Sequence, residues 1–216
     1  MPPSPLAQPP PKEFVRPNPE LRQAVSWVCD REPTFRTIEP LAGPLTVRCW
    51  PPGLASLVRI ILGQQLSSKA AQAIFQRLTQ TVELTPAGLA ACPEVTLRQV
   101  GFSRAKIATC QRLAETMLSN QLRLEALSLM SDAEVVDQLT QIKGIGVWTA
   151  EVYALFCLGR LGVLPASDLA IQIGYQRLNA MATRPTRPEL LALTAPLAPY
   201  GGAVAHLLWH YYRQSR

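Results

Sequence analysis

The sequence predicts an all-α protein. Apolar residues recur at the three- and four-residue spacing of helices through most of the chain. Prolines, glycines and Ser or Thr caps divide this pattern into short segments, as in a helical fold with tight connections. With 216 residues, of which 48% are hydrophobic, the chain is long enough to bury a core in one or two lobes.

Helices are expected along nearly the whole chain after a proline-rich start. Residues 1–18 are interpreted as an extended N-terminal arm, and residues 19–216 as the folded domain. The expected helices are 19–30, 53–63, 66–81, 86–91, 94–100, 103–118, 123–127, 131–141, 147–161, 168–180, 187–195 and 202–214. Two β-prone stretches, 35–38 and 45–48, predict a small two-stranded flap within residues 31–51.

The segment 131–161 predicts two helices joined by a tight glycine hairpin. Ser131 and Glu134 form the sequence signature of a capping box at the start of the first helix. The turn is Lys143-Gly144-Ile145-Gly146, in which the glycines permit close backbone approach and Ile145 can enter the core. The second helix then points free N–H groups at the turn, which makes an anion site, and Lys143 adds a cation. An ordinary helical corner with a glycine cap is the alternative.

Asp168 stands between an extended segment and a predicted helix. Pro165 disfavours helix at the residue before it, and the pattern from Leu169 onward is helical again. An acid at this place is typical of a helix N-cap. A carboxylate held at a helix N-terminus can also stabilise positive charge or activate water. Both interpretations remain open from the residues alone.

Three blocks in order resemble the helix-hairpin-helix DNA glycosylases, and among them the 3-methyladenine DNA glycosylase II type. The hairpin K-G-I-G-V-W-T-A is followed, about twenty residues later, by Pro165-Ala-Ser-Asp168. Residues 57–78 (LVRIILGQQLSSKAAQAIFQRL) and residues 101–115 (GFSRAKIATCQRLAE) match two further family segments. The resemblance covers roughly residues 20–212. It implies a compact bilobal fold without the larger members' N-terminal β domain, in which a cleft between the lobes holds the hairpin and Asp168.

The resemblance assigns roles to individual residues. It implies that Asp168 is the catalytic carboxylate, which stabilises an oxocarbenium-like sugar while the base leaves. The base pocket would be lined by Trp148, Tyr153 and Phe102, for each of which core packing is the alternative. The residues expected to wedge into the DNA stack are Gln65, Leu66 and Gln64, with the choice between 65 and 66 open. The expected phosphate-binding hairpin consists of Lys143, Gly144, Ile145, Gly146 and Thr149.

The expected activity is monofunctional. Relatives that also nick the strand carry a lysine where this chain has Trp148, and an indole cannot form a Schiff base. The resemblance therefore implies hydrolytic removal of alkylated purines, such as 3-methyladenine and 7-methylguanine, from double-stranded DNA to leave an abasic site in base excision repair. A non-catalytic lesion-binding protein is the alternative, and a purely structural α-helical adaptor is a third.

Composition adds expectations about partners and cofactors. The net charge of +6 suits a polyanionic partner. The five cysteines are scattered and none follows Cys157, so no iron–sulfur cluster is expected. No catalytic metal is expected, although the resemblance allows a monovalent cation at the hairpin carbonyls. His206 and His210 are read as surface or packing residues rather than a metal pair, and Trp209 as core. No membrane span is apparent, and an intracellular, DNA-associated monomer is expected.

One departure from the family pattern lies near the C-terminus. Similar proteins often begin the last helix with a basic residue and a Ser or Thr, where this chain has Gly201 and Gly202. The missing cation is expected to weaken DNA binding or alter substrate range, and the two glycines to loosen the start of the helix.

Overall fold

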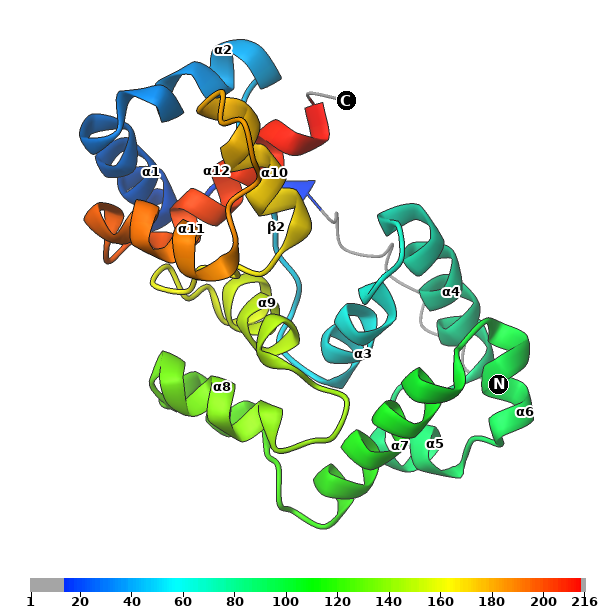
Figure 1. Ribbon diagram of the computed structural model, residues 1–216. Coiled ribbons are helices and arrows are strands. Elements are labelled where there is room, and N and C mark those ends of the chain that lie inside the picture. The colour runs from blue at the N-terminus through cyan, green and yellow to red at the C-terminus, as the bar shows by residue number, and fades with distance from the viewer. Residues whose placement is uncertain (1–13, 215–216) are drawn as a thin grey trace, which may run out of the picture.

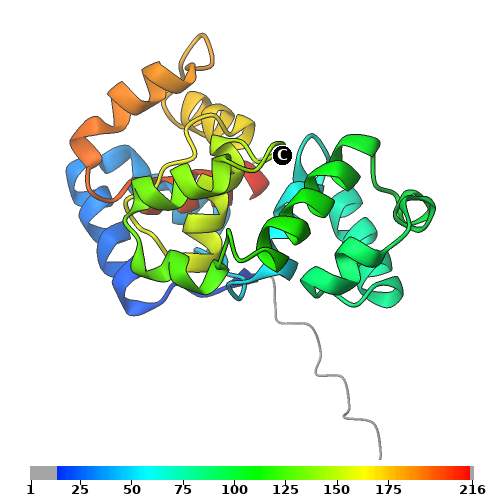
Figure 2. The same cartoon turned by 90° about the horizontal axis from the view of Figure 1, so that it is seen from below.

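The computed structural model describes residues 14–214, which form two lobes of packed helices (Figures 1 and 2). One lobe consists of α3 (Leu54–Gly63), α4 (Ser68–Thr81), α5 (Pro86–Ala91), α6 (Glu94–Val100) and α7 (Arg104–Leu118). The other consists of α1 (Pro19–Arg31), α2 (Ile38–Ala42), α8 (Asp132–Thr140), α9 (Val147–Leu158), α10 (Leu169–Leu178), α11 (Arg187–Thr194) and α12 (Gly201–Gln214). Short 3-10 turns are η1 (Pro33–Thr37), η2 (Leu124–Leu129) and η3 (Ala195–Leu197). The all-α prediction is confirmed.

The helices begin where side chains can cap them. Asn18, Ser67, Thr85 and Ser103 each accept a hydrogen bond from a backbone N–H in the first turn of the helix that follows. The cap at Ser67 explains why α4 starts at Ser68 rather than at the expected residue 66. Similarly, α9 ends three residues earlier than expected because Gly159 adopts the left-handed conformation of a C-cap, with φ of 69°.

The predicted flap within residues 31–51 is wrong in one of its two strands. Residues 47–48 form a strand (β2, Val47–Arg48), but its antiparallel partner is β1 (Phe14–Val15). The stretch 35–38 is helical instead, because Glu32 caps the N–H of Thr34 and Pro33 favours a helix start. The strand β1 lies within the segment expected to be a free arm. Of the remaining arm, residues 1–13 lie outside the described residues, and residues 16–18 lead into α1.

The two lobes meet where α3 packs against α9, at the centre of Figure 1. Two long-range hydrogen bonds fix this contact. The backbone N–H of Gly53 donates to the Tyr153 hydroxyl at 2.9 Å, and that of Trp50 donates to the Phe156 carbonyl at 3.0 Å. Tyr153 is fully buried, and burial raises the pKa of its hydroxyl to about 12. The segment that links β2 to α3 is therefore anchored on α9 before the chain enters the second lobe.

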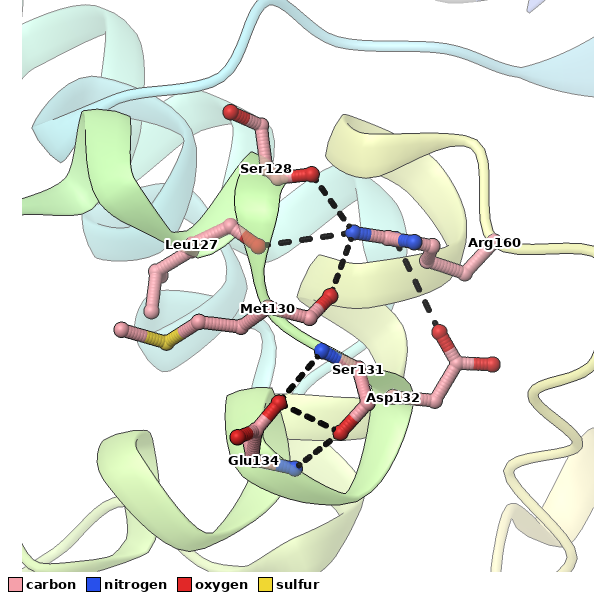
Figure 3. A network of polar contacts seen from close by, with 7 residues as sticks. All are labelled: Leu127, Ser128, Met130, Ser131, Asp132, Glu134 and Arg160. Carbon is pink, nitrogen blue, oxygen red and sulfur yellow. Dashed lines mark hydrogen bonds and ion pairs between the residues drawn. The ribbon is translucent and has the colours of Figure 1, made fainter.

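Arg160 closes the open end of the helical hairpin formed by α8 and α9 (Figure 3). Its guanidinium donates to the carbonyls of Ser128 and Met130, each at 2.8 Å, and lies 3.6 Å from the carboxylate of Asp132. The predicted capping box between Ser131 and Glu134 is present beside it. Since Arg160 follows α9 directly and Asp132 begins α8, this cluster holds the two helices together opposite their connecting turn.

The glycine pair at the start of α12 fixes the helix instead of loosening it. The N–H of Gly202 donates to the Leu161 carbonyl at 2.7 Å. A Cβ at Gly202 would lie 2.9 Å from backbone atoms of Leu161, and one at Gly201 would lie 3.0 Å from the Leu164 Cβ. A side chain at either position would push α12 away from the loop that leads to α10.

Two further features concern membranes and metals. Among residues 14–214, no single helix is long and apolar enough to span a bilayer; the pair Arg187–Leu197 and Gly201–Gln214 passes that test only when joined across a 116° bend. In the same part of the chain, no three His, Cys, Asp or Glu side chains form a group that could hold a metal ion.

Candidate functional site

Asp168 precedes α10 and is held by four hydrogen bonds. Its Oδ1 accepts from the N–H groups of Ala170 and Ile171 at 2.8 and 3.0 Å, which makes it the N-cap that its position predicts. The same oxygen accepts from the Trp209 indole at 2.9 Å, and Oδ2 accepts from the Trp148 indole at 2.9 Å. A carboxylate oxygen commonly accepts about two hydrogen bonds, so Oδ1 is saturated by its three donors, whereas Oδ2 has one donor. Oδ2 therefore keeps acceptor capacity, on a side chain that is only partly buried.

The two indoles come from different helices, α9 and α12, and both are partly exposed. Trp209 also packs on Phe156, with ring centroids 4.8 Å apart. Trp209 packs against the core as predicted, but it is only half-buried and its indole N–H also donates to Asp168. No local sequence pattern indicates this contact, since 41 residues separate the two partners. The result is a partly exposed site in which the N–H edges of two indoles hold a carboxylate in place.

The other two residues predicted for the base pocket do not line this site. Tyr153 is fully buried, and its hydroxyl serves the lobe contact at Gly53. Phe102 is 5% exposed and belongs to the hydrophobic core. Both face inward because they complete the apolar surface of their helices or turns. For these two residues the core-packing alternative is the correct one.

The hairpin turn is shaped by a close approach to α7. Gly144 has φ of 104°, and a Cβ there would lie 1.9 Å from the Thr109 hydroxyl oxygen. Ile145 is 3% exposed and fills the core as expected, whereas Lys143 and Gly146 are exposed. The first N–H groups of α9 have no helical partners and point toward this exposed side. Lys143 and Gly146 are therefore accessible beside this helix terminus, and phosphate binding there stays a prediction.

Thr149 is not available to a phosphate through its side chain. It is 1% exposed, and its hydroxyl oxygen accepts from the Gln64 amide at 2.9 Å. The same amide donates to the Gly144 carbonyl at 3.2 Å. Gln64 therefore joins the two lobes at the hairpin, which rules out the predicted wedge role for it in this conformation.

Gln65 and Leu66, the other two predicted wedge residues, do project into solvent. We call residues Gln65 and Leu66 the probing turn; it connects Gln64, the C-cap of α3, to Ser67 at the start of α4. Gln65 is exposed and has φ of 56°, while Leu66 is 42% exposed. A non-glycine residue rarely adopts this left-handed conformation. The choice between residues 65 and 66 stays open, because both side chains are accessible.

The histidine pair has a packing role. His206 is buried against Phe156, and burial lowers the pKa of its imidazole to about 3. His210 is also buried; its Nδ1 lies 3.1 Å from the Arg213 guanidinium, which can only donate. The other ring nitrogen therefore carries the proton and donates to the Gly43 carbonyl at 2.9 Å. The two side chains are packing groups, as one of the two predicted alternatives states.

Comparison with known proteins gives the chain a family. The model of the HhH-GPD superfamily of base excision DNA repair proteins matches residues 58–199. DNA-3-methyladenine glycosylase 1 of Schizosaccharomyces pombe is 37% identical over 161 residues, which are 71% of this chain and 69% of that protein.

Two solved structures share both fold and sequence similarity with the chain. The 3-methyladenine DNA glycosylase Mag1 of S. pombe, in complex with abasic DNA, has a TM-score of 0.81 at 32% identity and covers 87% of this chain and 95% of its own. A DNA-3-methyladenine glycosidase from Bacillus halodurans has a TM-score of 0.74 at 32% identity, covering 91% and 90%. The chain belongs to the HhH-GPD superfamily of base excision DNA repair proteins.

Proposed function

We propose that this protein is a monofunctional DNA glycosylase that removes alkylated purines, such as 3-methyladenine and 7-methylguanine, from double-stranded DNA. The observation that carries the proposal is the carboxylate of Asp168, fixed between two indoles with acceptor capacity left on Oδ2. The related S. pombe and B. halodurans proteins are named as 3-methyladenine glycosylases or glycosidases. Their substrate class matches the chemistry that this site can perform.

The reaction breaks the bond between C1′ of the sugar and the ring nitrogen of the base. The bonding electrons leave with the base, which is already cationic when alkylated and departs as a neutral molecule. The sugar acquires oxocarbenium character, and the carboxylate of Asp168 stabilises that charge. Water then adds to C1′ and loses a proton to the carboxylate or to solvent, which leaves an abasic site. A strong general acid is unnecessary because the leaving group needs no proton.

The two indoles have a double role in this proposal. Their N–H groups orient the carboxylate, and their faces attract a cationic base by cation–π interaction. This favours alkylated purines over the neutral bases that make up undamaged DNA. Among the described residues, the side chains that hydrogen-bond to Asp168 are these indoles. Residue 148 itself is a tryptophan, whose indole cannot form a Schiff base, and this supports a monofunctional reaction.

DNA would be held through its backbone. The exposed Lys143, Gly146 and the start of α9 suit a phosphate, and the chain's net charge of +6 favours a polyanion. A target base inside the duplex must be flipped out to reach Asp168. We further propose that the protein acts as a monomer in the compartment that holds the DNA.

A monovalent cation at the hairpin carbonyls fits only part of the turn. The carbonyls of Lys143 and Gly144 accept hydrogen bonds from Arg112 and Gln64 at 3.1 and 3.2 Å. A cation at these two oxygens would share them with those donors, so the other carbonyls of the turn would be the freer ligands. It would support the hairpin and take no part in bond cleavage.

The activity is tested on duplex DNA treated with a methylating agent. We expect the protein to release 3-methyladenine or 7-methylguanine, identified by mass spectrometry, and to leave strands that break only after alkali. Borohydride added during the reaction is expected to trap no covalent complex. A trapped complex, or strand breakage without alkali, would show that the enzyme is bifunctional and that the proposed mechanism is wrong.

Replacing Trp209 with Phe is expected to slow single-turnover base release roughly tenfold, since a charge-assisted hydrogen bond to Asp168 is lost while the aromatic face remains. The matched control is Trp27→Phe, because Trp27 packs edge-on against Tyr200 on another surface of the lobe. That control is expected to keep the wild-type rate. Equal rates for both variants would contradict an orienting role for Trp209.

A further inference from the structure

Lys106, in the first turn of α7, caps the end of α3. Its ammonium group donates to the carbonyls of Leu62 and Gln64 at 2.7 and 2.9 Å. These carbonyls lie at the C-terminus of α3, where the helix dipole favours a cation. The side chain is half-buried, and desolvation lowers the pKa of its amine. The lysine is thus engaged inside the protein, in contrast to Lys143, which is exposed at the hairpin.

Gln64 is held from two directions. Its carbonyl accepts from Lys106, within the lobe formed by α3–α7. Its side chain reaches the other lobe and donates to Gly144 and Thr149 at the hairpin. These contacts span 80 and 85 residues of sequence, so they join two distant parts of the chain. One residue therefore couples the hairpin to the end of α3.

The contacts of Gln64 hold the backbone of the next residue, Gln65, in an unusual conformation. Gln65 adopts the left-handed conformation with φ of 56° and projects into solvent together with Leu66. Such a conformation persists in a non-glycine residue when its surroundings fix the backbone. The fixed neighbour is Gln64, whose carbonyl and side chain are both bonded.

We propose that Lys106 and Gln64 are positioning residues that lock the probing turn to the hairpin. The phosphate anchor and the residues that test the base stack then move as one rigid unit. This rests on the proposed function, because it assumes that the hairpin faces DNA. When the turn is already ordered, none of the binding free energy is lost to ordering it as the wedge residue enters the base stack. Loss of either contact should therefore impair stack opening and base release, with little effect on the affinity for undamaged duplex.

The variants are Lys106→Met and Gln64→Met, which leave an unbranched side chain of similar length and remove its donors. Lys106→Arg is the conservative variant, since a guanidinium can still donate to both carbonyls. Arg123→Met is the control for the loss of one positive charge, because Arg123 is exposed at the start of η2. Thermal melting of each full-length variant shows that it is folded.

Two readouts separate positioning from the proposed activity. The first uses a duplex with a tetrahydrofuran abasic analogue and an adjacent 2-aminopurine, whose fluorescence rises when the stack is opened and which needs no catalysis. The second is single-turnover release of 7-methylguanine. If the wild type opens the stack but releases no base, the proposed function fails while the positioning test remains valid.

We expect Lys106→Met and Gln64→Met to lose most of the fluorescence rise and to slow base release roughly 10- to 100-fold. Their affinity for undamaged duplex should stay within about twofold of the wild type. The double mutant should release the base no more slowly than the slower of the two single variants, because both substitutions loosen the same turn. Lys106→Arg should recover most of the rate, and Arg123→Met should match the wild type. Three results would overturn the proposal. They are a fluorescence rise in Lys106→Met as large as in the wild type, a loss of affinity for undamaged duplex as large as the loss of base release, and no fluorescence rise in the wild type.

Discussion

Replacing Gly144 with Ala is expected to destabilise the protein by about 3–5 kcal/mol, which combines overpacking with a strained backbone. The new Cβ would lie 1.9 Å from the Thr109 hydroxyl oxygen, and φ at this residue is 104°. Neither partner can relax freely, because Thr109 is buried on α7 and its hydroxyl donates to the Ala105 carbonyl at 3.0 Å. In a chain of this length, such a loss should lower the melting temperature by roughly 10 °C.

Gly146→Ala is the matched control within the same turn. Gly146 has φ of −94°, and no atom lies within 4 Å of a Cβ built there. Its melting temperature should therefore stay within about 2 °C of the wild type. A methyl group at this exposed position would keep a phosphate away from the start of α9, so DNA affinity should fall several-fold. Wild-type DNA affinity in Gly146→Ala would show that this turn does not contact the backbone, and wild-type stability in Gly144→Ala would contradict the packing described here.

Local features of the fold could be predicted from the sequence because their causes are local. The capping box at Ser131 and Glu134 and the N-cap at Asp168 each involve partners within three residues. The hairpin turn and its buried Ile145 follow from glycine chemistry and apolar spacing. The pairing of the two strands is harder to predict, because β1 lies in a proline-rich segment far along the chain from β2.

The site itself was predicted only in part. Asp168 and Trp148 were identified by their resemblance to a family motif, and the structure brings them within 2.9 Å. The contribution of Trp209 was missed because it depends on how α12 packs beside α10, which no local pattern encodes. The same reason applies to Gln64, whose partners lie in the other lobe. Tyr153 was misplaced because on a helix buried nearly all round, such as α9, spacing cannot tell a pocket wall from core.

Asp168→Asn is expected to reduce base release by about two orders of magnitude or more, since the charge that stabilises the oxocarbenium ion is lost. The substitution is well suited to isolate catalysis from folding, because Asn is also a good N-cap. Its carbonyl oxygen can still accept from Ala170 and Ile171, so α10 should keep its start. Its amide nitrogen would replace Oδ2 and face the Trp148 indole N–H as a second donor, so the hydrogen bond from Trp148 is lost. We expect a melting temperature close to that of the wild type.

The most direct test of the account is single-turnover release of 7-methylguanine from one methylated duplex by the wild type and by Asp168→Asn, with binding to that duplex measured in parallel. We expect both proteins to bind the duplex and only the wild type to release the base at an appreciable rate. Binding by both with release by neither would contradict it and leave a protein that recognises lesions without removing them. Equal release by both would keep the glycosylase activity but exclude Asp168 from the chemical step.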